Sequence, residues 1–251
     1  VIQTSFNAIG QKEKNIKNGL EGYLKLKDGP GDFVKNSYLC ARNAYLSNEK
    51  NFLFGLGLDH IDVRYDKPKG RVKNFIKNFQ KYNLITHYTL DGSYILEKNT
   101  RKNFEQEKKK LFKEVIDFEV DIIKKINNSE IFDYEFCASE LSYVGNDKRM
   151  YIPSTKDLVF FSKTLYNKLH KEKLSLINMR PKLIIGNLGT THHGHDNNTV
   201  KVEMSKAWVA ETKKFSFVSA VLHGTSRSHP DTLRKAVVGC KKINVAGDFL
   251  Q

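Results

Sequence analysis

Short apolar runs alternate along the chain with longer segments in which apolar residues recur every three or four positions. Runs of the first kind are typical of buried strands, and segments of the second kind are typical of amphipathic helices. The apolar runs predict seven strands, at residues 1–5, 52–58, 85–90, 132–141, 182–188, 215–222 and 243–245. Helical patterns occupy most of the gaps between them. Because repeated strand–helix units form parallel sheets with crossover helices, the pattern predicts an α/β fold.

Three of the predicted helices are specified in more detail. A long charged helix after residue 100 has an apolar stripe made of Phe104, Leu111, Val115, Phe118, Ile122 and Ile126. Ser154 with Asp157 three residues later predicts the capped start of another helix. The apolar face of that helix consists of Leu158, Phe161, Leu165 and Leu169. Ser228 and Asp231 predict the start of the last helix, which Gly239 ends.

The number of strands favours one particular α/β architecture. A (β/α)8 TIM barrel has eight strands and typically about 250 residues. With seven strands in 251 residues, the chain is expected to form such a barrel without its first strand and last helix. Residues 1–251 would then be a single barrel domain that is incomplete at both ends. An open doubly wound sheet is the alternative, although no GxGxxG follows the first strand.

The formal net charge of +14 and the pI of about 9.5 raise the question of a nucleic-acid partner. The lysines, however, lie among glutamates in helical segments such as EQEKKKLFKE, and no nucleic-acid-binding motif is present. We interpret the excess of positive charge as a solvated basic face, which would also attract a phosphorylated substrate. Binding to nucleic acid is therefore not expected.

Hydropathy and cysteine content indicate a cytoplasmic protein. The mean hydropathy is −0.51, and no apolar run approaches the roughly 20 residues of a membrane span. The N-terminal segment VIQTSFNAIG lacks the basic and apolar regions of a signal peptide. The 3 cysteines, Cys40, Cys137 and Cys240, lie far apart and offer no CxxC pair.

Histidines stand at the ends of three apolar runs. His193 and His223 are each followed by glycine, and Asp59–His60 ends a third run. In parallel α/β folds, reactive residues gather beyond the carboxyl ends of the strands. Three imidazoles brought together there are a typical ligand set for a catalytic metal ion. The pattern therefore predicts a metalloenzyme.

Segments along nearly the whole chain resemble, in the same order, those of class II (metal-dependent) fructose/tagatose-bisphosphate aldolases. They are VIQTS, LGLDH, YTLDGS, ASELSYVG, GTTHHG, VLHGTSRS and KKINVAGD. The resemblance implies a zinc-dependent lyase that cleaves or forms a ketose bisphosphate. The typical substrate is fructose 1,6-bisphosphate, which gives glycerone phosphate and glyceraldehyde 3-phosphate. The resemblance also implies a homodimer.

The same resemblance assigns the zinc ligands to His60, His193 and His223. GTTHHG is one residue longer than the GTAHG of the family, so His192 is the alternative to His193. The glycine that follows His193 favours His193. Asp59 matches the acid/base that handles the proton of the C4 hydroxyl. Its alternative role is to orient His60.

Further residues match less specific positions of the family. Asp91 and Glu140 match acidic residues that orient the histidines or hold a second divalent ion, although ordinary polar residues also occur at strand ends. The resemblance implies a phosphate site that uses backbone N–H groups, hydroxyls and a monovalent cation. Its residues would be Gly194, Gly224, Ser226 and Asn244.

The chain also departs from the family. The HGLYK segment is replaced by HHGHDNN, Arg227 replaces a glycine, and Gly247 replaces a threonine that would contact phosphate. In the loop after SELS, only Asp147 remains to shuttle protons. These changes leave a second hypothesis open, a divergent or inactive aldolase-like protein with an altered substrate or a binding role.

Overall fold

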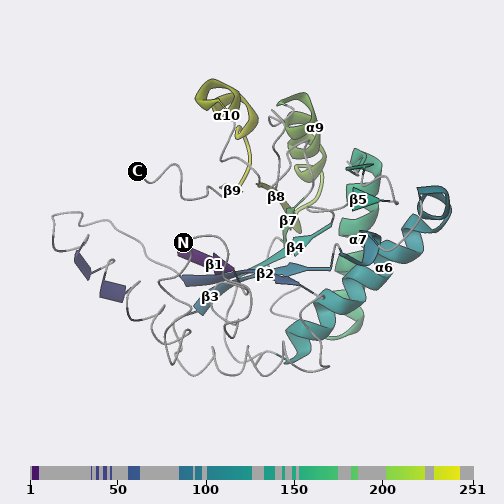
Figure 1. The fold of residues 1–251 in the computed structure, drawn as a ribbon, viewed down its shortest axis with the longest axis horizontal. Coiled ribbons are helices and arrows are strands. Elements are labelled where there is room, and N and C mark those ends of the chain that lie inside the picture. The colour runs from purple at the N-terminus through teal and green to yellow at the C-terminus, as the bar shows by residue number, and fades with distance from the viewer. Residues whose placement is uncertain are drawn as a thin grey trace. The chain divides into compact units, whose positions relative to one another are not determined.

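The computed structural model describes the parts of the chain drawn in colour in Figure 1. These are residues 2–5, 35, 38–39, 42–43, 46, 56–62, 85–92, 94–97, 101–125, 133–138, 143–144, 149–150, 153–174, 182–185, 202–223 and 229–243. The chain divides into two compact units. The first unit comprises Val1–Leu90 and Ile122–Tyr134, and the second comprises Asp91–Asp121 and Glu135–Gln251.

The first unit contains three strands in the order β1-β2-β3. They are β1 (Ile2–Ser5), β2 (Leu56–Asp62) and β3 (Ile85–Asp91), whose last residue belongs to the second unit. β1 and β2 pair in parallel, with Ser5 opposite Asp59. The core of this unit includes Tyr88, whose ring stacks on that of Tyr134 with 5.9 Å between ring centroids.

The second unit has a parallel sheet with the strand order β4-β7-β8-β9. Its strands are β4 (Asp133–Cys137), which enters this unit at Glu135, β7 (Lys182–Ile185), β8 (Val218–Leu222) and β9 (Lys242–Ile243). Glu135 is opposite Leu183, and Val221 is opposite Lys242. All seven predicted strands are therefore present, and the strands of this sheet run in one direction, as β1 and β2 do. The closed barrel stays a prediction.

A short antiparallel hairpin was not predicted. It consists of β5 (Tyr143–Val144) and β6 (Arg149–Met150). Strands of two residues leave no alternation of apolar and polar positions that a sequence pattern could reveal.

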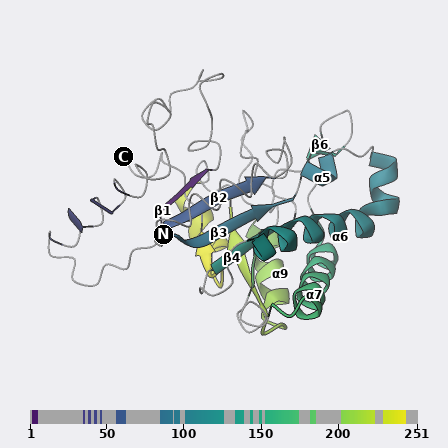
Figure 2. The same cartoon turned by 90° about the horizontal axis from the view of Figure 1, so that it is seen from below.

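The helices of the second unit include α5 (Tyr94–Glu97), α6 (Arg101–Lys125), α7 (Thr155–Lys171), α9 (Val202–Thr212) and α10 (Pro230–Ala236). The end of α6, from Ile122 on, belongs to the first unit. α9 packs against β8 and contacts both α7 and α10. Figure 2 shows α7 beside α6, where the rings of Phe112 and Phe161 meet edge to face at 5.8 Å. Among the described helices, none is both long and apolar enough to cross a membrane.

The buried face of α6 is wider than predicted. Leu111, Val115 and Ile122 are buried as expected, whereas Phe118 is only half-buried. The face also includes Phe112, Ile116, Glu119, Val120 and Ile123. The buried stripe of α6 is therefore about two side chains wide, where the pattern predicted one.

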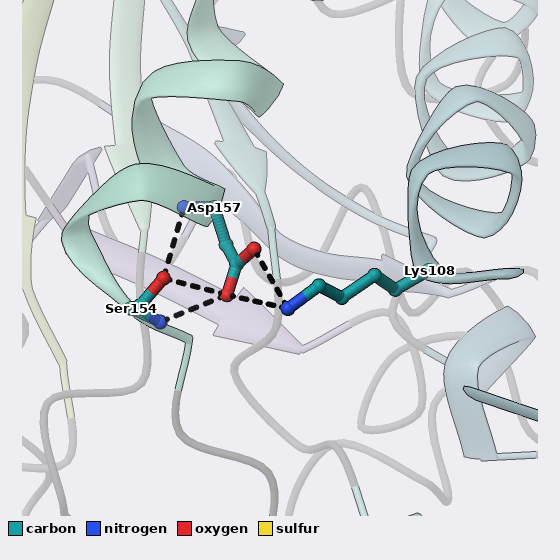
Figure 3. Close-up of polar contacts among 3 residues, drawn as sticks. All are labelled: Lys108, Ser154 and Asp157. Carbon is teal, nitrogen blue, oxygen red and sulfur yellow. Dashed lines mark hydrogen bonds and ion pairs between the residues drawn. The ribbon is translucent and has the colours of Figure 1, made fainter. Parts of the chain in front are cut away.

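The start of α7 confirms the predicted cap, which Figure 3 shows. The Ser154 hydroxyl accepts a hydrogen bond from the N–H of Asp157 at 3.2 Å, and Asp157 Oδ2 accepts one from the N–H of Ser154 at 3.1 Å. Lys108 of α6 lies 3.2 Å from Asp157 Oδ1, so the cap also joins the two helices. The four predicted apolar residues of α7 are all buried.

The start of α10 differs from the prediction. The helix begins at Pro230, and its N-cap is His229, whose Nδ1 accepts a hydrogen bond from the N–H of Asp231 at 3.3 Å. The predicted cap, Ser228, lies outside the described residues. Proline at the first helical position fixes the start one residue later than the serine pattern predicted. Gly239, with a φ of +88°, follows the end of the helix at Ala236.

We expect Ser154→Ala to lower the free energy of unfolding by about 1 kcal/mol, because one N–H group of the first turn of α7 loses its acceptor. Urea denaturation followed by circular dichroism measures this change. Ser154→Thr keeps the hydroxyl and is the matched control, with stability close to that of the unmodified chain. Equal stability of the alanine variant and the unmodified chain would show that the cap contributes nothing.

Candidate functional site

Among its described residues, the second unit buries three carboxyl groups and one imidazole in or next to the strands. Asp91 ends β3, Glu135 is the third residue of β4, and His223 directly follows β8. The fourth, Glu119, comes from α6. Each of the four is at most 3% exposed. Because charged groups are rarely buried without a partner, their partners indicate what the site can do.

Glu135 is the centre of a buried polar cluster. Its Oε2 lies 3.2 Å from Nε2 of His223, and its Oε1 forms an ion pair with the ammonium of Lys242. We call Glu135, His223 and Lys242 the strand-end triad. The three side chains come from β4, from the residue after β8, and from β9. Three elements distant in sequence therefore meet at one carboxylate.

The arrangement of the triad follows from strand geometry. Successive side chains of a strand point to opposite faces, so Glu135 and Cys137 share one face of β4. Val221 and His223 likewise share one face at the end of β8, and Cys137 and Val221 belong to one buried cluster. In a flat sheet, three spacings of about 4.8 Å would separate β4 from β9. The long side chains of Glu135 and Lys242 nevertheless meet across β7 and β8.

Because the triad is buried, each of its side chains relies on the others for hydrogen bonds or charge compensation. Glu135 is completely buried, and the side chain of Lys242 is 16% exposed. The ammonium of Lys242 compensates the negative charge of the Glu135 carboxylate, and the imidazole of His223 supplies a further hydrogen bond. Removing Glu135 or Lys242 would leave the other charge without this partner, which costs about 3–5 kcal/mol in comparable buried pairs.

Glu119 joins α6 to the ends of two strands. Its Oε1 accepts a hydrogen bond from the N–H of Cys137 at 3.0 Å, and it also bonds the backbone of Gly92, just beyond β3. In the described part of the chain, its Oε2 has no hydrogen-bond partner. Burial, followed by the charge of Asp91, raises the pKa of Glu119 well above its usual range, against the opposing effect of the two backbone bonds.

Gly92 lets α6 come close to the end of β3. A Cβ atom at this position would lie 2.8 Å from Cγ1 of Val115 and 3.2 Å from its backbone. A larger residue would therefore push α6 away from the strand end. The glycine of the YTLDGS motif thus brings Glu119 within reach of the backbone that it binds.

The raised pKa of Glu119 predicts how stability depends on pH. The unfolded chain ionises this carboxyl near its ordinary pKa, whereas the fold favours the protonated form. Stability from this group is therefore present below the ordinary pKa and is lost as the pH rises toward the folded value. Glu119→Gln keeps an acceptor oxygen but cannot ionise.

We therefore expect Glu119→Gln to gain stability relative to the unmodified chain as the pH rises from about 5 to about 8. Urea denaturation of the metal-free proteins at both pH values measures the difference. Glu211→Gln, a change of a glutamate at the end of α9 whose partner is Lys214, is the control and should follow the unmodified chain. The prediction would be contradicted if the free energy of unfolding changed with pH by the same amount in Glu119→Gln and in the unmodified chain.

The predicted site residues His223 and Asp91 are buried at strand ends, as expected. Asp59 and His60 do not follow a strand, because β2 spans Leu56–Asp62 and includes both. The predicted strand end at residue 58 is therefore wrong. The strand continues through the polar pair to Asp62 and includes Ile61, which is completely buried.

The remaining predicted site residues lie outside the described residues. They are Glu140, His192, His193, Gly194, Gly224, Ser226 and Asn244, together with Asp147, Arg227 and Gly247. Within the described ranges, no group of three or more His, Cys, Asp and Glu side chains forms a metal site. The predicted zinc set includes His193, so this finding does not test it.

Sequence reasoning missed Glu119, Glu135 and Lys242. Each of the two glutamates had a recognisable signal, since Glu119 interrupts the apolar face of a helix and Glu135 interrupts the apolar run FDYEFC. A charged residue at a core position is expected to have a buried partner. The identity of the partner is not readable from the pattern, because Glu135 is 88 residues from His223 and 107 from Lys242.

No protein-family model and no curated protein matches this sequence. Among solved structures, the chain is similar to a probable tagatose 6 phosphate kinase from Sinorhizobium meliloti 1021, with a TM-score of 0.63 and 14% identity over 98% of this chain. It is also similar to the fructose-bisphosphate aldolase of Campylobacter jejuni, with a TM-score of 0.53 and 18% identity over 96% of this chain. The chain spans 57% and 63% of their lengths, respectively. It therefore has an aldolase-like fold.

Proposed function

We propose that this protein is a class II, zinc-dependent aldolase that acts on a ketose bisphosphate. The observation that carries the proposal is the buried contact between His223 and Glu135 just beyond β8, where the resemblance places a zinc ligand. The two structural neighbours support the substrate class, because the names of both refer to phosphorylated ketohexoses. Fructose 1,6-bisphosphate is the first substrate to test.

The chemistry of this contact suits a zinc ion. Histidines that bind zinc usually donate their other N–H to a carboxylate, and Glu135 is such an acceptor for His223. We assign the ligands to His60, His193 and His223, with His192 as the alternative to His193. When bound, the ion would polarise the ketose carbonyl as a Lewis acid.

The surrounding residues would move the proton and hold the phosphate. Asp59 would take the proton of the C4 hydroxyl as the C3–C4 bond breaks, and return it in the condensation direction. Asp91 and Glu140 would orient the histidines or hold a second cation. A phosphate group would bind to the backbone and side-chain donors of Gly194, Gly224, Ser226 and Asn244.

The proposal is tested by a coupled assay of aldol cleavage with fructose 1,6-bisphosphate and tagatose 1,6-bisphosphate. We expect cleavage by the zinc-loaded chain, its loss after treatment with a chelator, and its return when zinc is added. A parallel assay measures ATP-dependent phosphorylation of tagatose 6-phosphate. Phosphorylation without cleavage would favour a kinase. A zinc-loaded chain with neither activity would favour the divergent aldolase-like protein.

A further inference from the structure

We propose that Glu135 is the positioning residue of His223. Lys242 would support this role by pairing with the other carboxylate oxygen of Glu135. The strand-end triad would fix both the orientation and the tautomer of the His223 ring. The part of this inference that concerns metal binding rests on the proposed function. The part that concerns the orientation and tautomer of His223 is argued from the geometry of the triad alone.

The chemistry of the contact determines which nitrogen carries the proton. An ionised carboxylate only accepts hydrogen bonds, so Nε2 of His223 must donate to Oε2 of Glu135 across their 3.2 Å separation. A neutral imidazole with its proton on Nε2 has its lone pair on Nδ1. We therefore assign metal binding by His223 to Nδ1.

Lys242 supplies the charge partner of Glu135. A completely buried carboxylate needs such a partner, and the ammonium of Lys242 is the cation that reaches it. The ammonium of Lys242 pairs with Oε1 and thereby leaves Oε2 to the imidazole. Each carboxylate oxygen thus has a separate partner.

The three residues of the triad lie in or directly beside strands of one sheet. Glu135 and Lys242 lie in strands of one parallel sheet, and His223 follows the central strand β8 without an intervening residue. Functional side chains on regular elements are held more accurately than those on loops. An ion pair that only stabilised the fold would not need to fix a histidine tautomer, and this difference can be measured.

The first test is NMR spectroscopy of the metal-free protein labelled with ¹⁵N-histidine. The signals of His223 are assigned from a His223→Gln variant. We expect the unmodified chain to show a single tautomer with the proton on Nε2. In Glu135→Gln we expect a mixture of tautomers, and Glu135→Asp should restore part of the preference.

The second test is zinc affinity, measured by competition with a chromophoric chelator. We expect Glu135→Gln to bind zinc about 10- to 100-fold more weakly, as is usual for the loss of such a carboxylate. Asp157→Asn is the matched control, because it removes another lysine-paired carboxylate, the partner of Lys108. Its zinc affinity should equal that of the unmodified chain.

If Glu135→Gln does not fold, the double variant Glu135→Gln/Lys242→Met takes its place, because it leaves no unpaired charge. Unchanged nitrogen signals and unchanged zinc affinity in a folded variant would overturn the inference, even if the chain is an active aldolase. A chain that binds no zinc but loses its His223 tautomer preference in Glu135→Gln would contradict the proposed function and support the positioning role.

Discussion

His223→Gln is expected to remove most zinc binding and to reduce aldol cleavage to background. The glutamine keeps an N–H donor for Glu135, so the variant tests the metal site without leaving that buried carboxylate unpartnered. Zinc affinity should fall by more than the roughly 10- to 100-fold that the loss of a supporting carboxylate costs. Elemental analysis after dialysis and the coupled assay measure both effects.

His170→Gln is the control for this variant. His170 is exposed in the last turn of α7, so its replacement should change neither zinc content nor cleavage. Full zinc content in His223→Gln would show that His223 is not a ligand. Its buried contact with Glu135 would then serve only the fold.

Asp59→Ala is expected to lower kcat by about 10²- to 10⁴-fold, the usual effect of losing a general acid or base. Zinc content should stay near one ion per chain, because the proposed ligand is the neighbouring His60. The coupled assay over a range of substrate concentrations separates kcat from KM, and elemental analysis gives the zinc content.

Asp117→Ala provides the matched control. Asp117 is a largely exposed carboxylate of α6 that pairs with Lys168, and its loss should leave kcat unchanged. If Asp59→Ala loses its zinc, Asp59 supports His60 and is not the acid/base. A kcat equal to that of the unmodified chain would exclude both roles.

The local features of the fold were readable from the sequence. The apolar runs identified the strands because a strand covered on both faces needs a continuous apolar sequence. The cap of α7 was readable because Ser154 and Asp157 satisfy backbone groups within one turn of themselves. In both cases the physical cause lies within a few residues of the pattern.

Features that depend on distant partners were not readable. β2 extends through Asp59 and His60 to Asp62, and β1 pairs with it as far as Asp59. The length of a strand thus depends on neighbours that are distant in sequence. The triad likewise depends on the order of the strands. The sequence identified His223 as a site residue, but Glu135 and Lys242 became visible only when the sheet brought them to it.

X-ray absorption spectroscopy of the zinc-loaded chain, combined with elemental analysis, tests the central claim most directly. The account predicts one zinc ion per chain with three imidazole nitrogens at about 2.0–2.1 Å, and the loss of most of that zinc in His223→Gln. A chain that retains no zinc would contradict the account. So would zinc bound mainly through sulfur at about 2.3 Å, or a spectrum that His223→Gln leaves unchanged.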